Sequence, residues 1–536
     1  MTPPVQRDIV GFWRQAERSP QRTAIVDVDG SPIVYGELLA SVNQLSNALE
    51  AAGVSLGGRV AVVAWNRCEM MSVALAASQI GATFTFVNAH SAASEITYIL
   101  DDSRPSVVFV GATTATVVLE ACSHATLAHP DIVSFDEHDA LVTLAQWVAT
   151  HPTTPPAIRQ AGSAMLYTSG TTGNPKGVQR EPLTAAPEES LVPYLALLTR
   201  FGIDVAHHAE GDGVHLVTSP LYHAAPLHVA LLALHLGHAV VLMDRFDARR
   251  SLELIEKNRV TWTHVVPTMM QRWMSLDATV RDGFDLASLR WVVHAAAPCP
   301  VDLKRAVLEW LGPVIFEYYS STEVGGTAIG AEEWLAHPGS VGRAWPGAEV
   351  RILDDQHRVL GPGETGDIYM RNIRPFTYHN DPDKTAASRV DDFVTVGDIG
   401  WLDEHGYLYI ADRRSDLILV GGANVYPAEV EAALRLHPAV GDAAVIGVPD
   451  ADLGQAVRAI IQLVENVSTD GLEDSLRAHC DTALGSQKRP GAYEFVAELP
   501  RTDTGKLLRR VLRERCGRAL GSTAGTAPDT SIKMMN

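Results

Sequence analysis

The feature of this sequence that most constrains its fold is the glycine-rich stretch at residues 166–178, LYTSGTTGNPKGV. It holds three glycines, four Ser or Thr hydroxyls and one lysine, and it continues the apolar run at 164–166, which we interpret as the end of a strand. Glycine lets backbone N–H groups turn toward an anion, while the hydroxyls and the lysine add donors and a positive charge. The stretch therefore predicts a phosphate-binding loop at the end of a strand.

Two other interpretations of this loop are weaker. The Walker A pattern requires a hydroxyl residue directly after the lysine, whereas Gly177 follows Lys176 here. A flexible linker is the second alternative, but a Pro-Lys-Gly ending directly after a strand is not typical of linkers.

Helix-like and strand-like segments alternate over residues 1 to about 160, which predicts a parallel sheet covered by helices. Residues 150–162 read as a connector into the loop. Beyond it, Pro182 and Pro187 interrupt the interval where a helix would follow, so we expect a looped or short-helical insertion there. We expect helices at residues 8–16, 35–52, 69–80, 227–236 and 252–258, and strands at 23–27, 59–64, 83–87, 106–110, 213–219, 239–243, 261–266 and 290–294.

Composition narrows the class of protein. A chain of 536 residues is too long for one core, so two or more domains are expected. The net charge of −20 argues against a general nucleic-acid surface, although a local loop can still hold a nucleotide. The N-terminus lacks an apolar signal segment, and the apolar stretches 70–89 and 215–243 read as buried helix-plus-strand pairs rather than membrane spans. Five sparse cysteines suggest a reducing compartment, and we expect a cytoplasmic protein.

Seven histidines between residues 207 and 238 raise the question of a metal site. No HExxH motif or His-x-His with nearby carboxylates is present, so we interpret most of them as core or surface residues rather than zinc ligands.

A second cluster of chemically useful residues is EYYSSTEVGG at 317–326. An aromatic ring can stack on a purine, Thr322 can donate to a phosphate, and Glu323 can supply a hard oxygen ligand to Mg²⁺. Taken alone, the stretch is equally compatible with a tight turn that carries core tyrosines.

Three further stretches follow toward the C-terminus. VGDIGW at 396–401 contains Asp398, whose carboxylate suits the paired hydroxyls of a ribose, although a turn residue is the ordinary alternative. IADRRSDLILVGGANVYPAEVE at 410–431 predicts a strand, a Gly-Gly loop and a helix that begins near Pro427, with a surface hairpin as the alternative. LPRTDTGKLLRR at 499–510 places Lys506 after a glycine and before a basic helix.

These five stretches, in this order, resemble the motifs of the adenylate-forming superfamily, which includes acyl-CoA synthetases, peptide-synthetase adenylation domains and firefly-type luciferases. The resemblance covers about residues 8–515. It implies an α/β protein with a large N-terminal domain of stacked β-sheets and flanking helices at 1–412, and a small mobile α+β domain at 413–516. Residues 517–536 are expected to form a disordered tail. The hinge is expected at 412–416, where Ser415 stands in place of the usual Lys or Asp.

The resemblance also implies roles for individual residues, in ATP, Mg²⁺, carboxylate and CoA binding. The following residues are implied to grip the β- and γ-phosphates: Thr168, Ser169, Gly170, Thr171, Thr172, Gly173 and Lys176. Thr168 and Glu323 are implied to hold Mg²⁺. The adenine is implied to lie against Ala295, Ala296 and Ala297, where many relatives have glycine, and to stack on Tyr319; Tyr318 and Ser320 are also expected to bind the cofactor. Thr322 is implied to contact the α-phosphate, and Asp398 and Arg413 the ribose. Lys506 is implied to bridge the carboxylate and ATP, and Gly421 and Gly422 to line the thiol channel.

The acyl site is implied to be guarded by His223 and lined nearby by Tyr222, Ala224, Ala225, Gly325, Gly326 and Ala328. An amino-acid adenylation domain normally offers an aspartate to the substrate ammonium at this point, and 220–237 contains none. Small apolar neighbours suit an uncharged, fairly bulky acyl group.

The resulting functional prediction is an ATP-dependent carboxylate–CoA ligase that acts on a fatty, aryl or sterol-type acid. The alternatives are a ligase that loads a separate acyl-carrier protein, a luciferase-like oxygenase, and a non-catalytic nucleotide-binding protein. No side-chain nucleophile is required, which agrees with the absence of a GxSxG motif. Neither nucleic acid nor a membrane is an expected partner, and a homodimer is the assembly considered.

Overall fold

The computed structural model describes residues 10–168, 175–181, 183–189, 198, 212–371, 375–450, 452–464, 467–502 and 505–522, with the backbone alone at 517–522. The chain forms two compact units. The large unit contains Met1–Gly363, Tyr369–Val396 and Leu402–Tyr409, and the small unit contains Glu364–Ile368, Gly397–Trp401 and Ile410–Asn536. The predicted domain boundary at 412/413 remains a prediction, since two short upstream segments also group with the small unit.

The large unit is built around a nine-stranded sheet. Its central strands pair in parallel and its two edges are antiparallel. The strands in spatial order are β17 (Arg343–Ala344), β16 (Thr327–Ile329), β15 (Ile315–Tyr319), β14 (Trp291–His294), β13 (Trp262–Val265), β11 (Val214–Val217), β12 (Ala239–Leu242), β1 (Thr23–Val26) and β2 (Pro32–Val34).

A second sheet of the large unit has six strands, all of which pair in parallel. The central strands of both sheets are buried on both faces, which is why they read as nearly continuous apolar runs. The parallel sheet predicted from the first 160 residues is confirmed by this six-stranded sheet. In spatial order the strands are β7 (Val142–Thr143), β6 (Asp131–Ser134), β5 (Val107–Val110), β3 (Arg59–Val63), β4 (Thr83–Val87) and β8 (Ser163–Ala164).

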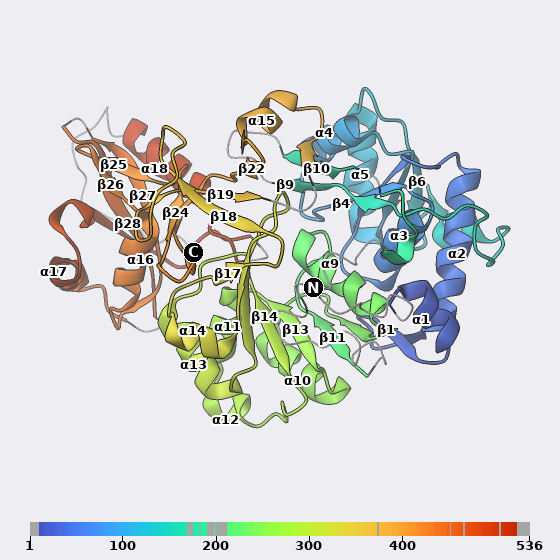
Figure 1. The fold of residues 1–536 in the computed structure, drawn as a ribbon, viewed down its shortest axis with the longest axis horizontal. Helices are drawn as coiled ribbons and strands as arrows, with labels where there is room; N and C mark the ends of the chain where they lie inside the picture. The colour runs from blue at the N-terminus through green and yellow to red at the C-terminus, as the bar shows by residue number, and fades with distance from the viewer. Residues whose placement is uncertain are drawn as a thin grey trace. The chain divides into compact units, whose positions relative to one another are not determined.

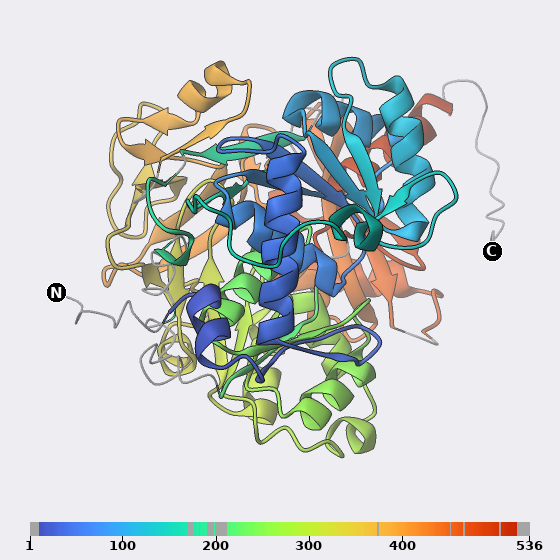
Figure 2. The ribbon, with the colours of Figure 1, turned by 90° about the vertical axis from the view of Figure 1, so that its right-hand side faces the viewer.

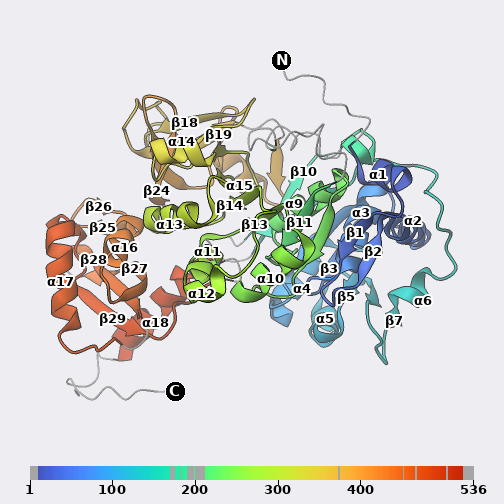
Figure 3. The ribbon, with the colours of Figure 1, turned by 90° about the horizontal axis from the view of Figure 1, so that it is seen from below.

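Helices cover both faces of each sheet. One core joins both sheets through α1 (Phe12–Arg18), α2 (Tyr35–Ala51), α3 (Cys68–Gln79) and α9 (Ala224–His235); α2 is the long blue helix at the centre of Figure 2. On the other face of the nine-stranded sheet lie α10 (Ala248–Asn258), α11 (Pro267–Met274) and α13 (Val301–Leu311); in Figure 1, α10 is seen below β11 and β13, and α11 and α13 to the left of these strands. On the other face of the six-stranded sheet lie α4 (Ala93–Ser103) and α5 (Ala112–His124), next to β3 and β5 in Figure 3.

A three-stranded sheet completes the large unit and carries the predicted phosphate loop. Its strands are β20 (Phe376–Tyr378), β10 (Lys176–Arg180) and β9 (Leu166–Thr168). The loop was expected to exit into an insertion, but β10 begins at its end because residues 176–180 find antiparallel partners on both sides. A short helical turn, Pro187–Glu189, follows, as expected.

The small unit is an α+β fold. Its sheet follows the order β26 (Ala423–Val425), β25 (Ile418–Val420), β28 (Gly454–Leu463), β27 (Val440–Asp450), with β29 (Ala492–Val496) beside β28. Alternate side chains of β27 and β28 face two cores. One is covered by α16 (Pro427–Arg435) and α17 (Leu472–Ala483), the other by α18 (Arg509–Ser522).

The large N-terminal and smaller C-terminal α/β fold is thus confirmed. The tail prediction is wrong for residues 517–522, since α18 continues to Ser522. The remaining tail lies outside the described residues.

A further set of short strands contains residues of both units. They are β18 (Glu349–Leu353), β19 (Gly366–Arg371), β21 (Arg389–Val390), β22 (Phe393–Val394), β23 (Asp398–Leu402) and β24 (Leu408–Arg413). Sequence periodicity did not reveal these strands, because β21 and β22 have two residues each and the four longer strands do not alternate regularly between buried and exposed positions. Short helices elsewhere in the large unit are α6 (Leu144–Val148), α12 (Ala278–Arg281), α14 (Ala331–Ala336) and α15 (Pro382–Ala387).

No helix in the described ranges is long and apolar enough to cross a membrane. The two apolar stretches noted in the sequence fold instead as helix–strand pairs, α3 with β4 and α9 with β12.

Candidate functional site

The predicted phosphate loop closes a hairpin. Thr168 at the end of β9 and Lys176 at the start of β10 face each other as paired residues. The ammonium of Lys176 forms an ion pair with Asp381, the N-cap residue of α15. The hydrogen bond from Lys176 holds the pKa of Asp381 below its usual value. The predicted contacts Ser169, Gly170, Thr171, Thr172 and Gly173 lie outside the described residues.

Glu323 is held by the same small sheet. Its side chain is 7% exposed, and the Tyr378 hydroxyl on β20 donates a 3.1 Å hydrogen bond to its Oε1. Burial, followed by the Glu323 charge, raises the pKa of Tyr378, so this tyrosine remains a donor. Arg180 on β10 donates to the carbonyl oxygens of Thr322 and Glu323, at 3.0 and 3.2 Å. The strand β10, which follows the loop, and its neighbour β20 therefore position the predicted magnesium ligand.

The chain around Glu323 is a tight turn, as the structural alternative for this stretch anticipated. Ser321 Oγ accepts hydrogen bonds from the N–H groups of Glu323 and Val324, both at 3.1 Å, and Ser320 Oγ donates to the Val324 carbonyl. A Cβ on Gly326 would lie 1.6 Å from the Tyr319 carbonyl oxygen. Only glycine fits this close approach, which brings the chain after Glu323 back against the end of β15.

Ala295, Ala296 and Ala297 directly follow β14, next to the end of β15. Ala296 has φ +74°, in the left-handed region that L-residues avoid. A glycine would adopt this conformation without strain, which is a physical reason to expect glycine here.

A buried ion pair lies directly beneath these two strand ends. Lys304 of α13 contacts Glu317 of β15 at 2.5 Å, and their side chains are 1% and 8% exposed. His294, the last residue of β14, lies 3.6 Å from the same Glu317 oxygen. Burial, followed by the Lys304 charge, lowers the pKa of His294 well below its usual value, so this imidazole is neutral. The cluster ties α13, β14 and β15 together at the predicted adenine side.

Four of the predicted acyl-site residues, Tyr222, His223, Ala224 and Ala225, lie at the start of α9, and the others lie between β15 and β16 or on β16. His223 is its N-cap residue, and its ring centroid is 4.7 Å from that of buried Tyr222. The preceding turn is fixed by Asn66, which is buried, donates to the carbonyls of Ser219 and Met243, and accepts from the Leu221 N–H.

The other histidines of this region do not form a metal site in the described part of the chain. His215, His235 and His238 are buried in the core, as expected, and none belongs to a cluster of three ligands. His207 and His208 lie outside the described residues.

In the small unit, Asp398 and Arg413 come together as predicted from the sequence. They lie at the start of β23 and the end of β24, and Arg413 Nε is 3.1 Å from Asp398 Oδ1. Asp398 is buried, whereas the Arg413 side chain is 43% exposed.

Lys506 belongs to the same electrostatic cluster. Burial, followed by the charge of Arg413, lowers its pKa to about 8, while Asp398 and Asp416 act in the opposite direction. Its backbone is anchored in a turn, where Thr502 Oγ1 accepts from the Lys506 N–H at 3.1 Å and the Thr502 N–H donates to the Lys506 carbonyl. A lysine whose pKa is this close to neutrality can be used as a cation and is sensitive to nearby charge.

Gly421 and Gly422 form the two-residue turn of the β25–β26 hairpin. Both have positive φ, +55° and +84°, which this turn requires at both positions. Upstream, Asp412 accepts from the N–H of Ala428 at 2.8 Å, and Asp416 accepts from Arg513 at 2.8 Å. Both ends of the predicted hinge segment are therefore anchored in the small unit, and its role as a hinge remains a prediction.

Sequence reasoning missed the residues that support the site. Arg180, Tyr378, Asp381 and Asn66 act through hydrogen bonds and ion pairs across long sequence separations. Only Asp381 carried a local signal, because Asp followed by Pro marks a helix start.

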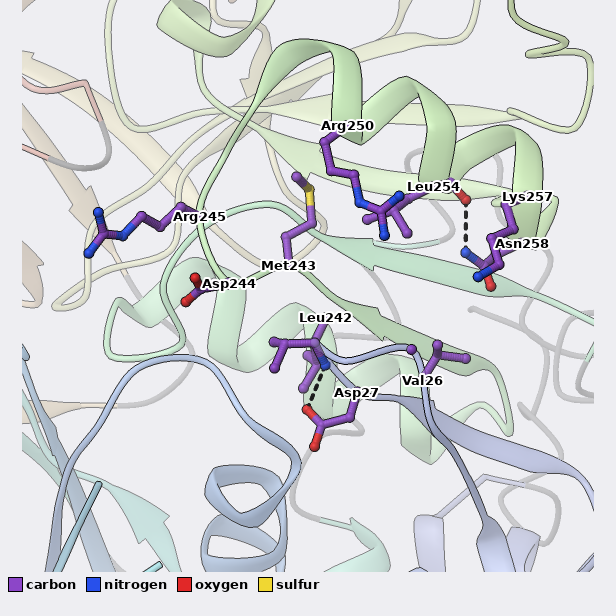
Figure 4. Close-up of a pocket in the computed structure, with 12 residues that line it drawn as sticks. Val26, Asp27, Leu242, Met243, Asp244, Arg245, Arg250, Leu254, Lys257 and Asn258 are labelled. Atoms are coloured by element: carbon purple, nitrogen blue, oxygen red, sulfur yellow. Dashed lines mark hydrogen bonds between the residues drawn. The ribbon is translucent and has the colours of Figure 1, made fainter. Parts of the chain in front are cut away.

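A pocket of about 190 Å³ lies elsewhere in the large unit, between the ends of β1 and β12 and one face of α10 (Figure 4). Its lining mixes cationic Arg245, Arg250 and Lys257 with the carboxylates Asp27 and Asp244, and it contains none of the predicted site residues. The enclosed space of this pocket therefore does not coincide with the predicted chemistry.

Comparison with known proteins gives consistent matches along the chain. The family described as AMP-binding enzyme matches residues 12–376, and the AMP-binding enzyme C-terminal domain matches 429–506. The chain is 33% identical to the fatty acid–[acyl-carrier-protein] ligase ScoC of Streptomyces coeruleorubidus, over 93% of this chain and 94% of that protein. It is 31% identical to the long-chain-fatty-acid–CoA ligase FadD13 of Mycobacterium tuberculosis, over 94% and 97%.

A solved structure with a similar fold is the o-succinylbenzoate CoA synthetase of Bacillus subtilis in complex with its acyl-adenylate intermediate. It superposes with a TM-score of 0.79 at 27% identity and covers 94% of this chain and 97% of that one.

Proposed function

Because the chain belongs to the family of adenylate-forming AMP-binding enzymes, in its acyl-CoA synthetase branch, we propose that it activates an uncharged, largely apolar carboxylic acid with ATP and transfers the acyl group to CoA. The observation that supports this most directly is Lys506. Lys506 is half-buried, and burial followed by the charge of Arg413 lowers its pKa to about 8, while Asp398 acts in the opposite direction. That is the environment expected for a cation that must meet a carboxylate and a phosphate in one reaction.

In the proposed first half-reaction, the carboxylate attacks the α-phosphorus of ATP and forms an acyl-AMP, with release of pyrophosphate. A carboxylate and a polyphosphate repel each other, so the cations Lys176 and Lys506 are assigned to offset this repulsion. Thr322 is assigned to the α-phosphate, Tyr319 to the adenine, and Asp398 to the ribose.

The residues at Glu323 fit a magnesium ion bound together with substrate phosphates. A buried carboxylate and the Thr168 hydroxyl are hard oxygen ligands, and Mg²⁺ is typically held by one or two such groups plus phosphate oxygens. Glu323 and Thr168 would hold it, and it would supply charge neutralisation at the phosphates. Tyr378 and Arg180 keep Glu323 in place for that role.

In the proposed second half-reaction, the CoA thiol attacks the acyl carbon and AMP leaves. The Gly421–Gly422 turn is assigned to the path of the thiol, where the absence of side chains leaves room for a narrow substrate arm.

A second candidate acceptor is a separate acyl-carrier protein. The similarity to an acyl-carrier-protein ligase, at 33% identity over nearly the full chain, is the observation that favours it. Both acceptors present the same kind of thiol, so the first half-reaction is common to both.

The test is ATP–pyrophosphate exchange across a panel of fatty, aryl and sterol-type acids, followed by thioester analysis with CoA and with a carrier protein as acceptor. We expect acid-dependent exchange and acyl-CoA as the product. Exchange followed by transfer to the carrier protein alone would favour the second candidate. If none of the acids supports exchange, the proposed function is contradicted.

A further inference from the structure

A buried histidine on one face of the nine-stranded sheet has no part in the reaction proposed above. His264 of β13 is 3% exposed, and in register it lies between Val217 of β11 and Val293 of β14. Both valines belong to the core that α9 covers, and α9 begins directly after His223. His264 therefore lies beneath α9, which begins directly after the predicted acyl-site residue His223, in a layer that holds buried His215 as well as apolar side chains.

One of its two ring nitrogens has a partner. His264 Nε2 is 3.1 Å from the hydroxyl of Tyr318, whereas Nδ1 has no hydrogen-bond partner among the residues that the structure describes. Burial lowers the pKa of His264 to about 4, so the ring is neutral near pH 7. A buried polar atom without a partner costs free energy, and such atoms are rare in proteins unless a ligand or a water satisfies them.

A second buried donor lies near Tyr318. The Trp345 ring centroid is 6.5 Å from that of Tyr318, and its Nε1–H likewise has no partner within the described ranges. The backbone N–H of Trp345 donates to the Gly326 carbonyl at 3.0 Å, and Tyr318 is paired with Ala328 in register. Gly326 and Ala328 are two of the predicted acyl-site residues, so this polar group adjoins the predicted acyl wall.

The position along the strands points the same way. His264 and Tyr318 are each the second-to-last residue of a parallel strand, β13 and β15. In open α/β sheets, ligands bind at the carboxyl ends of the strands. Tyr319 and the predicted adenine-binding residues 295–297 lie at this same end of the sheet.

We propose that the acid activated by this chain carries a hydroxyl group remote from its carboxylate, and that His264 Nδ1 forms a hydrogen bond with that hydroxyl; this inference rests on the function proposed above. A hydroxyl can donate and accept, so it fits either tautomer of a neutral imidazole whose Nε2 is bound to Tyr318. The substrate class is then a hydroxylated, otherwise apolar acid rather than a plain hydrocarbon acid.

The test compares acids that differ by one hydroxyl. Suitable pairs are dodecanoic acid and its ω-hydroxy form, phenylpropanoic acid and its para-hydroxy form, and cholanic acid and its ring-hydroxylated form. The acid with the highest kcat/KM for ATP–pyrophosphate exchange in the panel is paired with the analogue that lacks or gains the hydroxyl. For the wild-type chain we expect the hydroxylated member to be preferred by about tenfold to a hundredfold, because the analogue leaves the imidazole unpaired.

Two variants of His264 separate hydrogen bonding from packing. His264→Leu is expected to remove the preference while exchange with the unhydroxylated acid is retained, and His264→Asn, which keeps a polar atom near the Nδ1 position, is expected to keep much of the preference. His215→Leu is the matched control, because His215 is also buried on this face and also lacks hydrogen-bond partners in the described part of the chain. This control is expected to keep the full preference.

The outcomes distinguish the two proposals. Exchange without any preference for the hydroxylated acid, or a preference that survives in His264→Leu, would overturn this inference and leave the proposed function standing. No exchange with any acid would overturn both. Retained exchange with the unhydroxylated acid also shows that the His264 variants are folded.

Discussion

At the scale of single residues, the protonation state of Lys506 is expected to determine the rate of ATP–pyrophosphate exchange. Its pKa is lowered to about 8, first by burial and then by Arg413. The proposed role requires the ammonium form, which exists below this pKa. We therefore expect kcat/KM for ATP–pyrophosphate exchange to fall as the pH rises through about 8, by about tenfold per pH unit.

The variant Arg413→Gln tests the cause of this pH dependence. Removing the neighbouring positive charge favours protonated Lys506, so its pKa should rise toward its ordinary value and the alkaline limb should move to higher pH. Weaker ribose binding is expected to lower the maximum of the pH profile of kcat/KM. The pH at which kcat/KM begins to fall is measured independently of that maximum. A limb that stays in place or moves to lower pH would contradict the assignment.

Ala296 allows a stability prediction. Its φ of +74° is strained for any residue with a Cβ, at a cost of about 1 kcal/mol. Ala296→Gly should therefore raise the free energy of unfolding by up to about 1 kcal/mol, measured by thermal or denaturant unfolding. The matched control is Ala297→Gly, which removes no such strain and is expected to destabilise slightly. Equal effects of the two substitutions would contradict the prediction.

At the scale of secondary-structure elements, a substitution in the β25–β26 hairpin turn is expected to affect only the second half-reaction. Both of its glycines have positive φ, and the proposal assigns them to the thiol path. Gly421→Val should lower thioester formation from supplied acyl-AMP by about tenfold or more, while ATP–pyrophosphate exchange stays within about twofold of wild type. Loss of exchange alone would contradict the assignment.

The variant Gly471→Val is the control for the effect of backbone strain alone. Gly471 also has positive φ in the small unit, with no atom within 4 Å of the position that a Cβ would take, but it lies at the start of α17. This variant should leave both half-reactions unchanged.

The buried pair between α13 and β15 is a second prediction at this scale. Lys304→Met would leave the Glu317 carboxylate without its cation and should lower the free energy of unfolding by about 3–5 kcal/mol. The double variant Lys304→Met with Glu317→Gln should recover much of this loss, because no uncompensated charge remains. Thermal unfolding of both single variants and the double variant measures the coupling; additive losses would show that the pair is not a unit.

Much of this element-level architecture could be predicted from sequence. Parallel strands buried on both faces are apolar runs of four or five residues, and α2 and α3 fill the intervals between them. The strands β16, β17 and β26, at or next to a sheet edge, have two or three residues, too few for a periodic signal, and β10 exists because β9 and β20 pair with it.

The candidate site likewise contains residues that could be predicted from the sequence and residues that could not. The residues in sequence motifs, such as Glu323 and Asp398, were found because several suitable groups lie close together in the chain. The pairing of Asp398 with Arg413 followed from the resemblance alone. Tyr378 and Arg180 could not be found, because they reach Glu323 across 55 and 143 residues of sequence, through sheet pairing that no local pattern encodes.

At the scale of the whole molecule, the proposed chemistry is divided between two units. Thr168, Lys176 and Glu323 belong to the large unit, and Asp398, Arg413 and Lys506 to the small unit. A division of this kind predicts that residues of the small unit can be altered so that one half-reaction fails and the other is retained.

The most direct test of this account is to measure the two half-reactions separately in Lys506→Ala. The rate of acyl-AMP formation, measured by ATP–pyrophosphate exchange, should fall by at least about a hundredfold, because the cation that offsets the repulsion between carboxylate and phosphate is lost. Thioester formation from supplied acyl-AMP and CoA should remain close to the wild-type rate. An equal fall in both half-reactions would contradict the account.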